Sequence, residues 1–166
     1  MPGGQSPILT DRLVLEPLRL EHADEMVSLL SDLSLFGFTG GTPPTLDALR
    51  ATYGRWATER CGPSGERWLN WVARERRIGA PVGWLQATLT GGRAELAWTI
   101  GNDYQGRGLA REAAAAVVDQ LRGAGIRQFV AHIHPQHNAS IAVATAIGML
   151  PTDRSVDGEV VWATCG

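Results

Sequence analysis

Apolar and polar residues alternate along this chain with two different periods, and each period predicts one class of element. Alternation at every second residue is typical of strands, whereas apolar residues three and four positions apart are typical of helices. The resulting order is β-α-α-β-β-β-α-β-α-β-β, which predicts an α+β fold built in layers. We expect strands at 12–18, 68–76, 81–89, 94–100, 127–134, 151–156 and 159–164, and helices at 21–30, 45–60, 107–121 and 139–147.

Glycine and proline mark the interruptions between these elements. The segment 33–44 holds three glycines and two prolines, so we expect no regular structure there. Pro17 has no backbone N–H near the end of the strand at 12–18, which indicates a strand at a sheet edge. The pair Asp157-Gly158 predicts a tight hairpin between the last two strands.

Composition limits the class of protein. The 166 residues are 44% hydrophobic and 19% charged, which is the balance of a globular chain and not of a disordered one. No linker or repeat divides them, so we expect residues 1–166 to form a single domain. The formal net charge of −2 provides no basic field for nucleic acid or a membrane surface. No stretch holds the roughly 18–20 apolar residues that a membrane span needs.

The cysteine and lysine content excludes some kinds of site and catalytic mechanism. The two cysteines, Cys61 and Cys165, stand too far apart in the sequence for a metal-ligand spacing or a small disulfide scaffold. No secretory signal is visible at the N-terminus, so a reducing, cytoplasmic location is expected. All fifteen basic residues other than histidine are arginine, which excludes a catalytic lysine.

Two glycines, Gly106 and Gly108, stand in the turn that opens the helix expected at 107–121. Backbone N–H groups can converge in such a turn, and the helix dipole adds partial positive charge, so the turn suits a phosphate or pyrophosphate. The alternative is that the glycines only make a tight strand-to-helix connection. A dinucleotide fingerprint fails because Arg111 stands where a small residue is needed, and a P-loop fails because it requires a lysine.

The same turn, together with its flanks, resembles a known family. Gln105-x-x-Gly108-x-Ala110, which follows a strand and opens a helix, resembles the acyl-CoA pyrophosphate loop of the GNAT superfamily of N-acetyltransferases. The segment 94–100 resembles the central strand before that loop. Residues 10–18 resemble the opening of the RimJ/RimL-like branch, and 134–149 resembles the strand–helix motif that completes the cofactor cleft. The matches cover residues 8–164 in the family's order.

This resemblance implies a GNAT-like fold and a co-substrate. The fold would be a central, mostly antiparallel twisted sheet with a V-shaped split between the strands at 94–100 and 127–134, and with helices on both faces. Acetyl-CoA would lie in the split, with its pantetheine arm against the first strand and its pyrophosphate on the loop. The cofactor-binding residues implied are Trp98, Thr99, Ile100, Gln105, Gly106, Arg107, Gly108, Leu109, Ala110, His137 and Asn138.

Direct acetyl transfer needs a base for the amine and a proton for the leaving thiolate. By resemblance, Glu95 is the general base; the alternative is a surface carboxylate at a strand end. Ser140 aligns with a serine that lies near the CoA sulfur in RimL-like members; the alternative is a residue that bonds backbone amides in the first helical turn. The family's asparagine is replaced by His137, three residues before Ser140, and Asn138 stands one position late.

Aromatic residues are the candidates for the acceptor side. We expect Phe36 and Phe38, in the segment 33–44, and Trp71 to contact the substrate, because loops carry specificity and the resemblance puts these segments on the acceptor side. Trp56 falls in a similar segment, and core packing is the alternative for each tryptophan. Three histidines at 132, 134 and 137 have no cysteine or carboxylate nearby in sequence, so no metal is expected.

The leading function is therefore transfer of an acetyl group from acetyl-CoA to a primary amine, either a protein N-terminus or a small molecule. No acidic tract marks a receptor for polycations, which disfavours polyamines and aminoglycosides. A non-catalytic acyl-CoA sensor is the main alternative. A nucleotide-binding regulator would rest on the glycine-rich turn alone. The sequence does not determine the oligomeric state, and a homodimer is one possible assembly.

Overall fold

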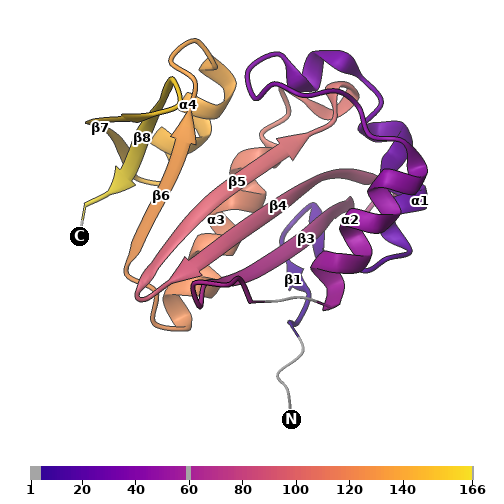
Figure 1. Ribbon diagram of the computed structural model, residues 1–166, viewed down its shortest axis with the longest axis horizontal. Coiled ribbons are helices and arrows are strands. Elements are labelled where there is room, and N and C mark those ends of the chain that lie inside the picture. Colours follow the sequence, from indigo (N-terminus) through magenta and orange to yellow (C-terminus); the bar gives the residue numbers. More distant parts are fainter. Residues whose placement is uncertain (1–4, 59–60, 166) are drawn as a thin grey trace.

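One sheet of eight strands forms the centre of the computed structural model, which describes residues 5–58 and 61–165 (Figure 1). The strands lie in the order β1-β2-β3-β4-β5-β6-β8-β7. Every neighbouring pair is antiparallel except β5 and β6, which run parallel. Their bounds are β1 Ile8–Leu9, β2 Leu13–Pro17, β3 Arg67–Glu75, β4 Pro81–Thr90, β5 Arg93–Ile100, β6 Gln128–Ile133, β7 Met149–Val156 and β8 Glu159–Thr164.

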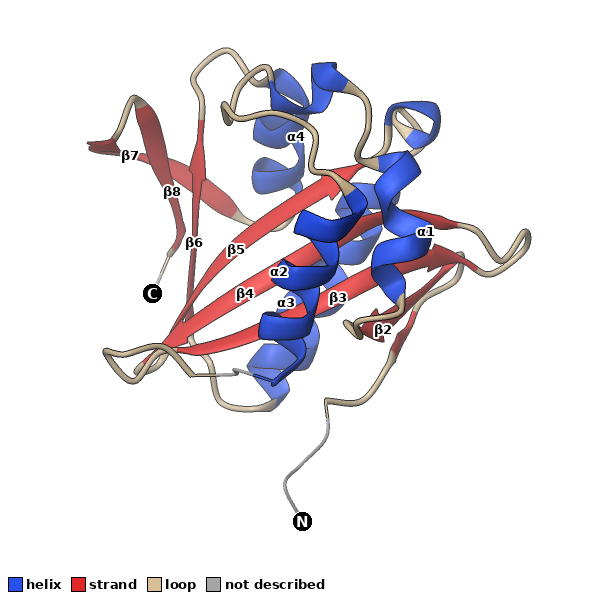
Figure 2. Cartoon of the chain, turned by 45° about the vertical axis from the view of Figure 1, so that its right-hand side comes forward, coloured by secondary structure: helices blue, strands red, loops and turns tan. Residues whose placement is uncertain are grey.

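Helices cover both faces of this sheet, as Figure 2 shows with α2 in front of the central strands and α3 behind them. On one face α3 (Leu109–Gly123) and α4 (Asn138–Ala146) bury their apolar stripes in the larger of two cores. On the other face α1 (His22–Leu29) and α2 (Leu46–Thr58) pack on a smaller core that includes Val72 of β3. The expected α+β fold, a mostly antiparallel sheet with helices on both faces, is thus confirmed.

Two local expectations were wrong. The strand at 12–18 is not at the edge, because the two-residue strand β1 pairs with β2 on its outer side. The segment 33–44 is not wholly irregular, because residues Leu33–Phe36 form a short 3-10 helix, η1, whose N-cap Asp32 accepts a hydrogen bond from the N–H of Ser34. A short polar side chain can form such a cap despite the glycines that follow.

The hairpin at Asp157-Gly158 is confirmed. Both residues have positive φ, +50° and +82°, as the central positions of a two-residue hairpin turn require. Within the described parts of the chain, no helix combines the length and the apolar character needed to cross a membrane.

Candidate functional site

The parallel strands β5 and β6 separate soon after they meet. Their pairing covers only Arg93 with Gln128, Ala94 with Phe129, and Glu95 with Val130. Beyond Glu95 the edge of β5 is unpaired on this side, while β6 continues against β8. Figure 1 shows the two ribbons diverging toward α4. The split therefore begins at Glu95 and widens toward the C-terminal ends of both strands.

Main-chain groups of β5 face this gap at every second residue. The N–H of Gly101 donates to a carbonyl oxygen at the start of β4 (2.8 Å). Since backbone groups alternate in direction along an antiparallel strand, Thr99 also points toward β4, whereas Trp98 and Ile100 point into the gap. The Ile100 carbonyl already accepts a hydrogen bond from Gln105 Nε2 (2.9 Å). Of the three residues expected to offer backbone groups to a ligand, Trp98 has both its N–H and its carbonyl oxygen facing the gap; ligand binding by the three stays a prediction.

The turn before α3 has the geometry of an anion site. Gly106 and Gly108 both have φ of +77°, a conformation that side chains with a Cβ rarely adopt. Gly108 is the N-cap of α3 and provides no side-chain cap, so the first N–H groups of the helix are open to a ligand. Leu109 buries its side chain in the core, and can therefore contribute only its backbone, as can Ala110 in the same first turn.

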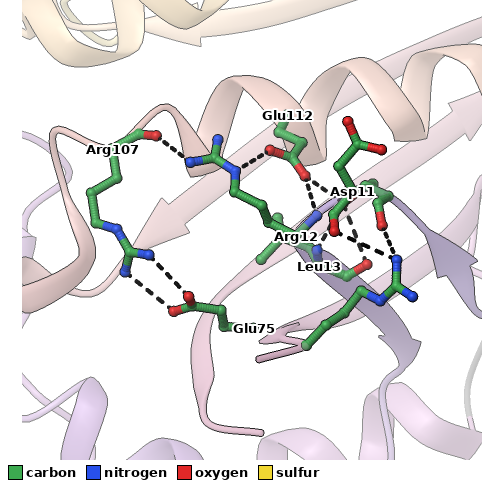
Figure 3. A network of polar contacts seen from close by, with 8 residues as sticks. Asp11, Arg12, Leu13, Glu75, Arg107 and Glu112 are labelled. Atoms are coloured by element: carbon green, nitrogen blue, oxygen red, sulfur yellow. Dashed lines mark hydrogen bonds and ion pairs between the residues drawn. The ribbon is translucent and has the colours of Figure 1, made fainter. Parts of the chain in front are cut away.

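Arg12, the residue before β2, ties this turn to the sheet (Figure 3). It donates through Nη1 to the carbonyl oxygen of Arg107 (2.8 Å) and through Nε to Glu112 (2.6 Å). A Cβ added at Gly108 would lie 3.5 Å from Arg12 Nη2. Burial acts to raise the pKa of Glu112, but hydrogen bonds from Thr10 and Arg12 outweigh it and hold that pKa below its usual value. Sequence reasoning missed Arg12, because its partners are about a hundred residues away.

Arg107 has a different partner from the one we expected. Its guanidinium donates two hydrogen bonds to Glu75 at the end of β3 (2.9 and 3.2 Å; Figure 3). The Glu75 side chain is 8% exposed, and the hydrogen bonds from Arg107 hold its pKa below the usual range. The ion pair fixes the turn to the sheet and gives Arg107 a positioning role, while its contact with a phosphate stays a prediction. Arg111, in the first turn of α3, is exposed, and within the described residues its side chain forms no hydrogen bond or ion pair.

At the start of α4, His137 and Ser140 bond to each other. The Ser140 N–H donates to His137 Nδ1 (3.4 Å), and Ser140 Oγ lies 3.2 Å from His137 Nε2. Burial, together with the nearby His134, lowers the pKa of His137, so the ring is neutral at neutral pH. If Nδ1 accepts, the single ring proton is on Nε2 and is donated to Ser140 Oγ. The serine hydroxyl then keeps its own proton for another acceptor. Asn138 is exposed at the first position of the helix.

Phe38 joins this cluster from the other half of the chain. Its ring stacks on His137 (centroids 4.6 Å, interplanar angle 23°) and lies 5.1 Å from His134. At the other end of the segment, Asn102 after β5 donates to Asp32 and Ser34. The segment 33–44 thus connects the end of β5 with α4 across the open end of the gap, as its purple ribbon shows in Figure 1. Hydrogen bonds from Ser34 and Asn102 lower the pKa of Asp32.

Glu95 stands apart from this cluster, at the last paired position of β5 and β6. Its side chain is 44% exposed and lies 3.8 Å from His132 Nδ1. It shares a sheet face with Ala97 and Thr99, opposite the buried Leu96. Among the described residues, no hydrogen bond or ion pair connects Glu95 with Ser140.

A cavity of about 170 Å³ lies between α2 and the sheet, and we call it the α2 cavity. Phe36 lines it, as does Trp56. Trp71 does not line it. The Trp71 side chain is 1% exposed in the core on the α3 face, and its expected contact with substrate stays a prediction that this burial does not support. Its indole Nε1 is the single fully buried side-chain donor or acceptor without a partner in the described residues. The complete lining is Leu18, Leu30, Phe36, Pro44, Leu49, Thr52, Tyr53, Trp56, Asn70, Trp84 and Leu85.

Solved structures share this fold. An acetyltransferase of the GNAT family from Bacillus anthracis superposes with a TM-score of 0.79 at 17% identity, covering 95% of this chain and 97% of that one. A putative ribosomal-protein-serine acetyltransferase from Vibrio cholerae gives 0.74 at 17% identity, covering 98% of both chains. AAC(6')-Ib in complex with ribostamycin and coenzyme A gives 0.76 at 17% identity, covering 93% of both chains.

No curated protein matches the sequence. A family profile does: the one described as "Acetyltransferase (GNAT) domain" matches residues 12–150. That range runs from the start of β2 to the beginning of β7, and so includes the gap, the turn before α3 and the His137–Ser140 cluster. The chain therefore belongs to the GNAT acetyltransferase family.

Proposed function

We propose that this protein transfers the acetyl group of acetyl-CoA to a primary amine. The observation that carries the proposal is the unpaired edge of β5 next to a helix that begins with an uncapped, glycine-formed turn. An extended amide chain can pair with an open strand edge, and a pyrophosphate can accept from the first N–H groups of a helix. The two features lie on one continuous path from Trp98 to Gly108.

The residues present fit acetyl-CoA in charge as well as in shape. Trp98 offers a backbone donor and acceptor for the amide groups of a pantetheine arm. Gly106 and Gly108 leave the phosphate approach free of Cβ atoms, and Arg111 is exposed beside them. Arg12 and Arg107 hold the turn in place through Glu112 and Glu75, so that the N–H groups are positioned before a ligand arrives.

Acetyl-CoA, when bound, supplies a thioester that an amine can attack. The chain must then take a proton from the amine and provide one for the sulfur. In this proposal Glu95 takes the first proton, directly or through water, because it is the acidic side chain on the central strand. Ser140 provides or orients the second, since the hydrogen bond from His137 leaves its hydroxyl proton available.

A sensor that binds acyl-CoA without turnover is the second candidate. It is favoured by the exposure of Glu95 and by the lack of a hydrogen-bonded connection from Glu95 to Ser140 within the described residues. Placement in the RimJ/RimL-like branch is supported by residues 10–18 and by the likeness to the Vibrio protein. Both cysteines are free and exposed, which suits a reducing compartment such as the cytoplasm.

One experiment separates these candidates. Acetyl-CoA binding is measured by calorimetry, and release of free thiol from acetyl-CoA is followed across a panel of primary amines and short peptides. Binding with amine-dependent thiol release supports the transferase. Binding without turnover across the whole panel supports the sensor. Absence of acetyl-CoA binding contradicts both.

A further inference from the structure

None of the residues assigned to the cofactor lines the α2 cavity. We propose that it holds the ring of the acceptor, and that the acceptor is a primary amine carrying one aromatic ring on a short carbon chain. This inference rests on the proposed acetyl transfer. It goes further in naming the class of amine and the residues that select it.

The lining of the cavity is aromatic and uncharged. Four rings contribute to it, from Phe36, Tyr53, Trp56 and Trp84, and none of the other lining residues is acidic or basic. An ammonium group placed inside would lose its hydration without gaining a counter-charge. Flat apolar groups, in contrast, pack well against aromatic faces and edges. The cavity therefore suits the ring of an amine and excludes polycationic acceptors such as polyamines.

Its size sets an upper limit on the ring system. The volume is about 170 Å³. An apolar cavity of about 150 Å³ holds a single benzene molecule, whereas pockets for drug-sized ligands are typically about 300–1,000 Å³. The cavity therefore matches one six-membered ring in size and is smaller than a two-ring system or an aminoglycoside requires.

Two residues with polar groups, Tyr53 and Asn70, line the cavity. Tyr53 is 2% exposed, and its hydroxyl has no hydrogen-bond partner among the described residues. Burial raises the pKa of Tyr53, so the group stays a neutral hydroxyl. Asn70 is 6% exposed and its Oδ1 accepts from Gln86 Nε2 (2.8 Å), which leaves its amide N–H groups without a protein partner in the same residues. These groups can bond a hydroxyl on the ring, which a purely apolar wall could not do.

The strand register connects the cavity with the gap. Asn70 of β3 pairs with Gln86 of β4, which pairs with Ala97 of β5. These three residues form one row on the face that α2 covers, and adjacent strands are about 4.8 Å apart. Ala97 is exposed and Glu95 is two residues away on the same face. An amine on a short chain can thus extend from a ring in the cavity toward the unpaired edge of β5 and toward the proposed base.

Direct binding is tested first, in the absence of acetyl-CoA. Tyramine, 2-phenylethylamine, tryptamine and putrescine are titrated into the full chain, and binding is followed by ligand-observed NMR. We expect 2-phenylethylamine to bind, and tyramine to bind more tightly because of its ring hydroxyl. Tryptamine and putrescine should bind at least ~10-fold more weakly than 2-phenylethylamine, because a second ring or a second charge does not fit the cavity. If putrescine or tryptamine binds as well as 2-phenylethylamine, the proposed class is wrong.

Two neighbouring residues of α2 provide a matched pair of variants. Thr52 lines the cavity and Ala51 is exposed. Thr52→Phe should fill the cavity and raise the KM for 2-phenylethylamine by ~10-fold or more, whereas Ala51→Phe should leave it unchanged. The Kd of acetyl-CoA should be the same in both. Trp56→Ala should enlarge the cavity and admit tryptamine, which keeps the test valid if Thr52→Phe fails to fold.

The outcomes distinguish this inference from the proposed function. If another amine is acetylated while 2-phenylethylamine neither binds nor reacts, the transferase stands and the cavity assignment is overturned. If no amine is acetylated but 2-phenylethylamine binds and Thr52→Phe abolishes that binding, the cavity assignment stands and the transferase fails. Equal KM values for the Thr52→Phe and Ala51→Phe variants would overturn the cavity assignment whatever the activity.

Discussion

The turn at 101–108 and the segment 33–44 both border the open end of the β5–β6 gap, but they are held differently. Gln105 fixes the turn to β5, Arg107 fixes it to β3, and Arg12 fixes it to the residue before β2; the tie to β3 is an ion pair with the nearly buried Glu75. The segment 33–44 is held by hydrogen bonds at exposed side chains and by stacking of the half-exposed Phe38.

The difference matches the roles proposed for the two segments, cofactor binding for the turn and acceptor binding for the segment 33–44. A cofactor is the same in every turnover, so a pre-positioned set of N–H groups binds it without a cost of ordering. Acceptors differ among proteins of one fold, and loops with few buried contacts tolerate the changes that alter specificity. We therefore expect substitutions in the turn to act on cofactor binding, and substitutions in or under the segment 33–44 to act on the amine.

The largest effect is expected at Gly108. In Gly108→Val a β-branched residue would need a φ of +77°, and its side chain would occupy the approach to the helix N–H groups. Acetyl-CoA binding, measured by calorimetry, should fall by more than ~100-fold. Gly91→Val is the control, because Gly91 has a similar φ of +61° in the β4–β5 turn; it should lose stability and keep its affinity for acetyl-CoA. Equal affinities in Gly108→Val and the parent would exclude this turn as the phosphate site.

The next effect is expected at Glu95. Glu95→Gln keeps the shape of the side chain and removes the base, so kcat should fall by ~10²-fold or more, with little change in KM for acetyl-CoA. The acidic limb of the pH–rate profile should disappear, since glutamine does not titrate. Asp103→Asn, at the other end of β5, should change neither quantity. A parental rate with the acidic limb retained would remove Glu95 from the site.

Ser140→Ala tests the thiol end of the cluster. Loss of the hydroxyl should lower kcat by up to ~10²-fold, while the affinity for acetyl-CoA changes little, because the Ser140 backbone N–H to His137 remains. Thr145→Ala is the matched control: its hydroxyl bonds the Ile141 carbonyl on the same helix, away from the cluster. An unchanged kcat in Ser140→Ala would leave the serine with a structural role only.

A smaller effect is expected at Phe38. Aromatic stacking contributes about 0.5–1.5 kcal/mol, so Phe38→Ala should lower kcat/KM for the amine by about two- to tenfold. Affinity for acetyl-CoA should stay the same, in contrast to Gly108→Val. Leu33→Ala, at a residue that is 65% exposed in the same segment, should have no effect. A loss of cofactor affinity in Phe38→Ala would contradict the division of roles between the two segments.

The smallest effect is the dependence of stability on pH. Burial acts to raise the pKa of Glu16, but hydrogen bonds from Arg74 and His22 hold this pKa below its ordinary value of 4.5. The pKa of Glu112 is also lowered. A lowered pKa in the folded state means that stabilisation is complete above the ordinary pKa and is lost as pH falls through the folded value. Tm should therefore decrease below about pH 4.5. The double variant Glu16→Gln, Glu112→Gln should be less stable than the parent at pH 7, and its Tm should decrease less than that of the parent below about pH 4.5.

Local patterns predicted most of the fold. Helix and strand periods depend on neighbours two to four residues apart. Each predicted helix and strand is present, and its described ends differ from the predicted ones by three residues at most. The C-terminal end predicted for the helix at 45–60 lies outside the described residues. The glycine turn at 106–108 and the hairpin at Asp157-Gly158 were predicted for the same reason, because a positive φ is a local requirement.

Tertiary structure decided which side chains meet. Trp71 and Trp84 look alike in the sequence, but strand register places the first in the core on the α3 face and the second in the α2 cavity. Arg107 pairs with Glu75, 32 residues away, and Thr99 turns its backbone toward β4. These outcomes depend on how strands pair and layers pack, over distances along the chain that no local pattern spans. The amino-acid sequence thus determined the elements and the glycine turn proposed to bind the cofactor, and packing of the layers determined which residues line the proposed acceptor side.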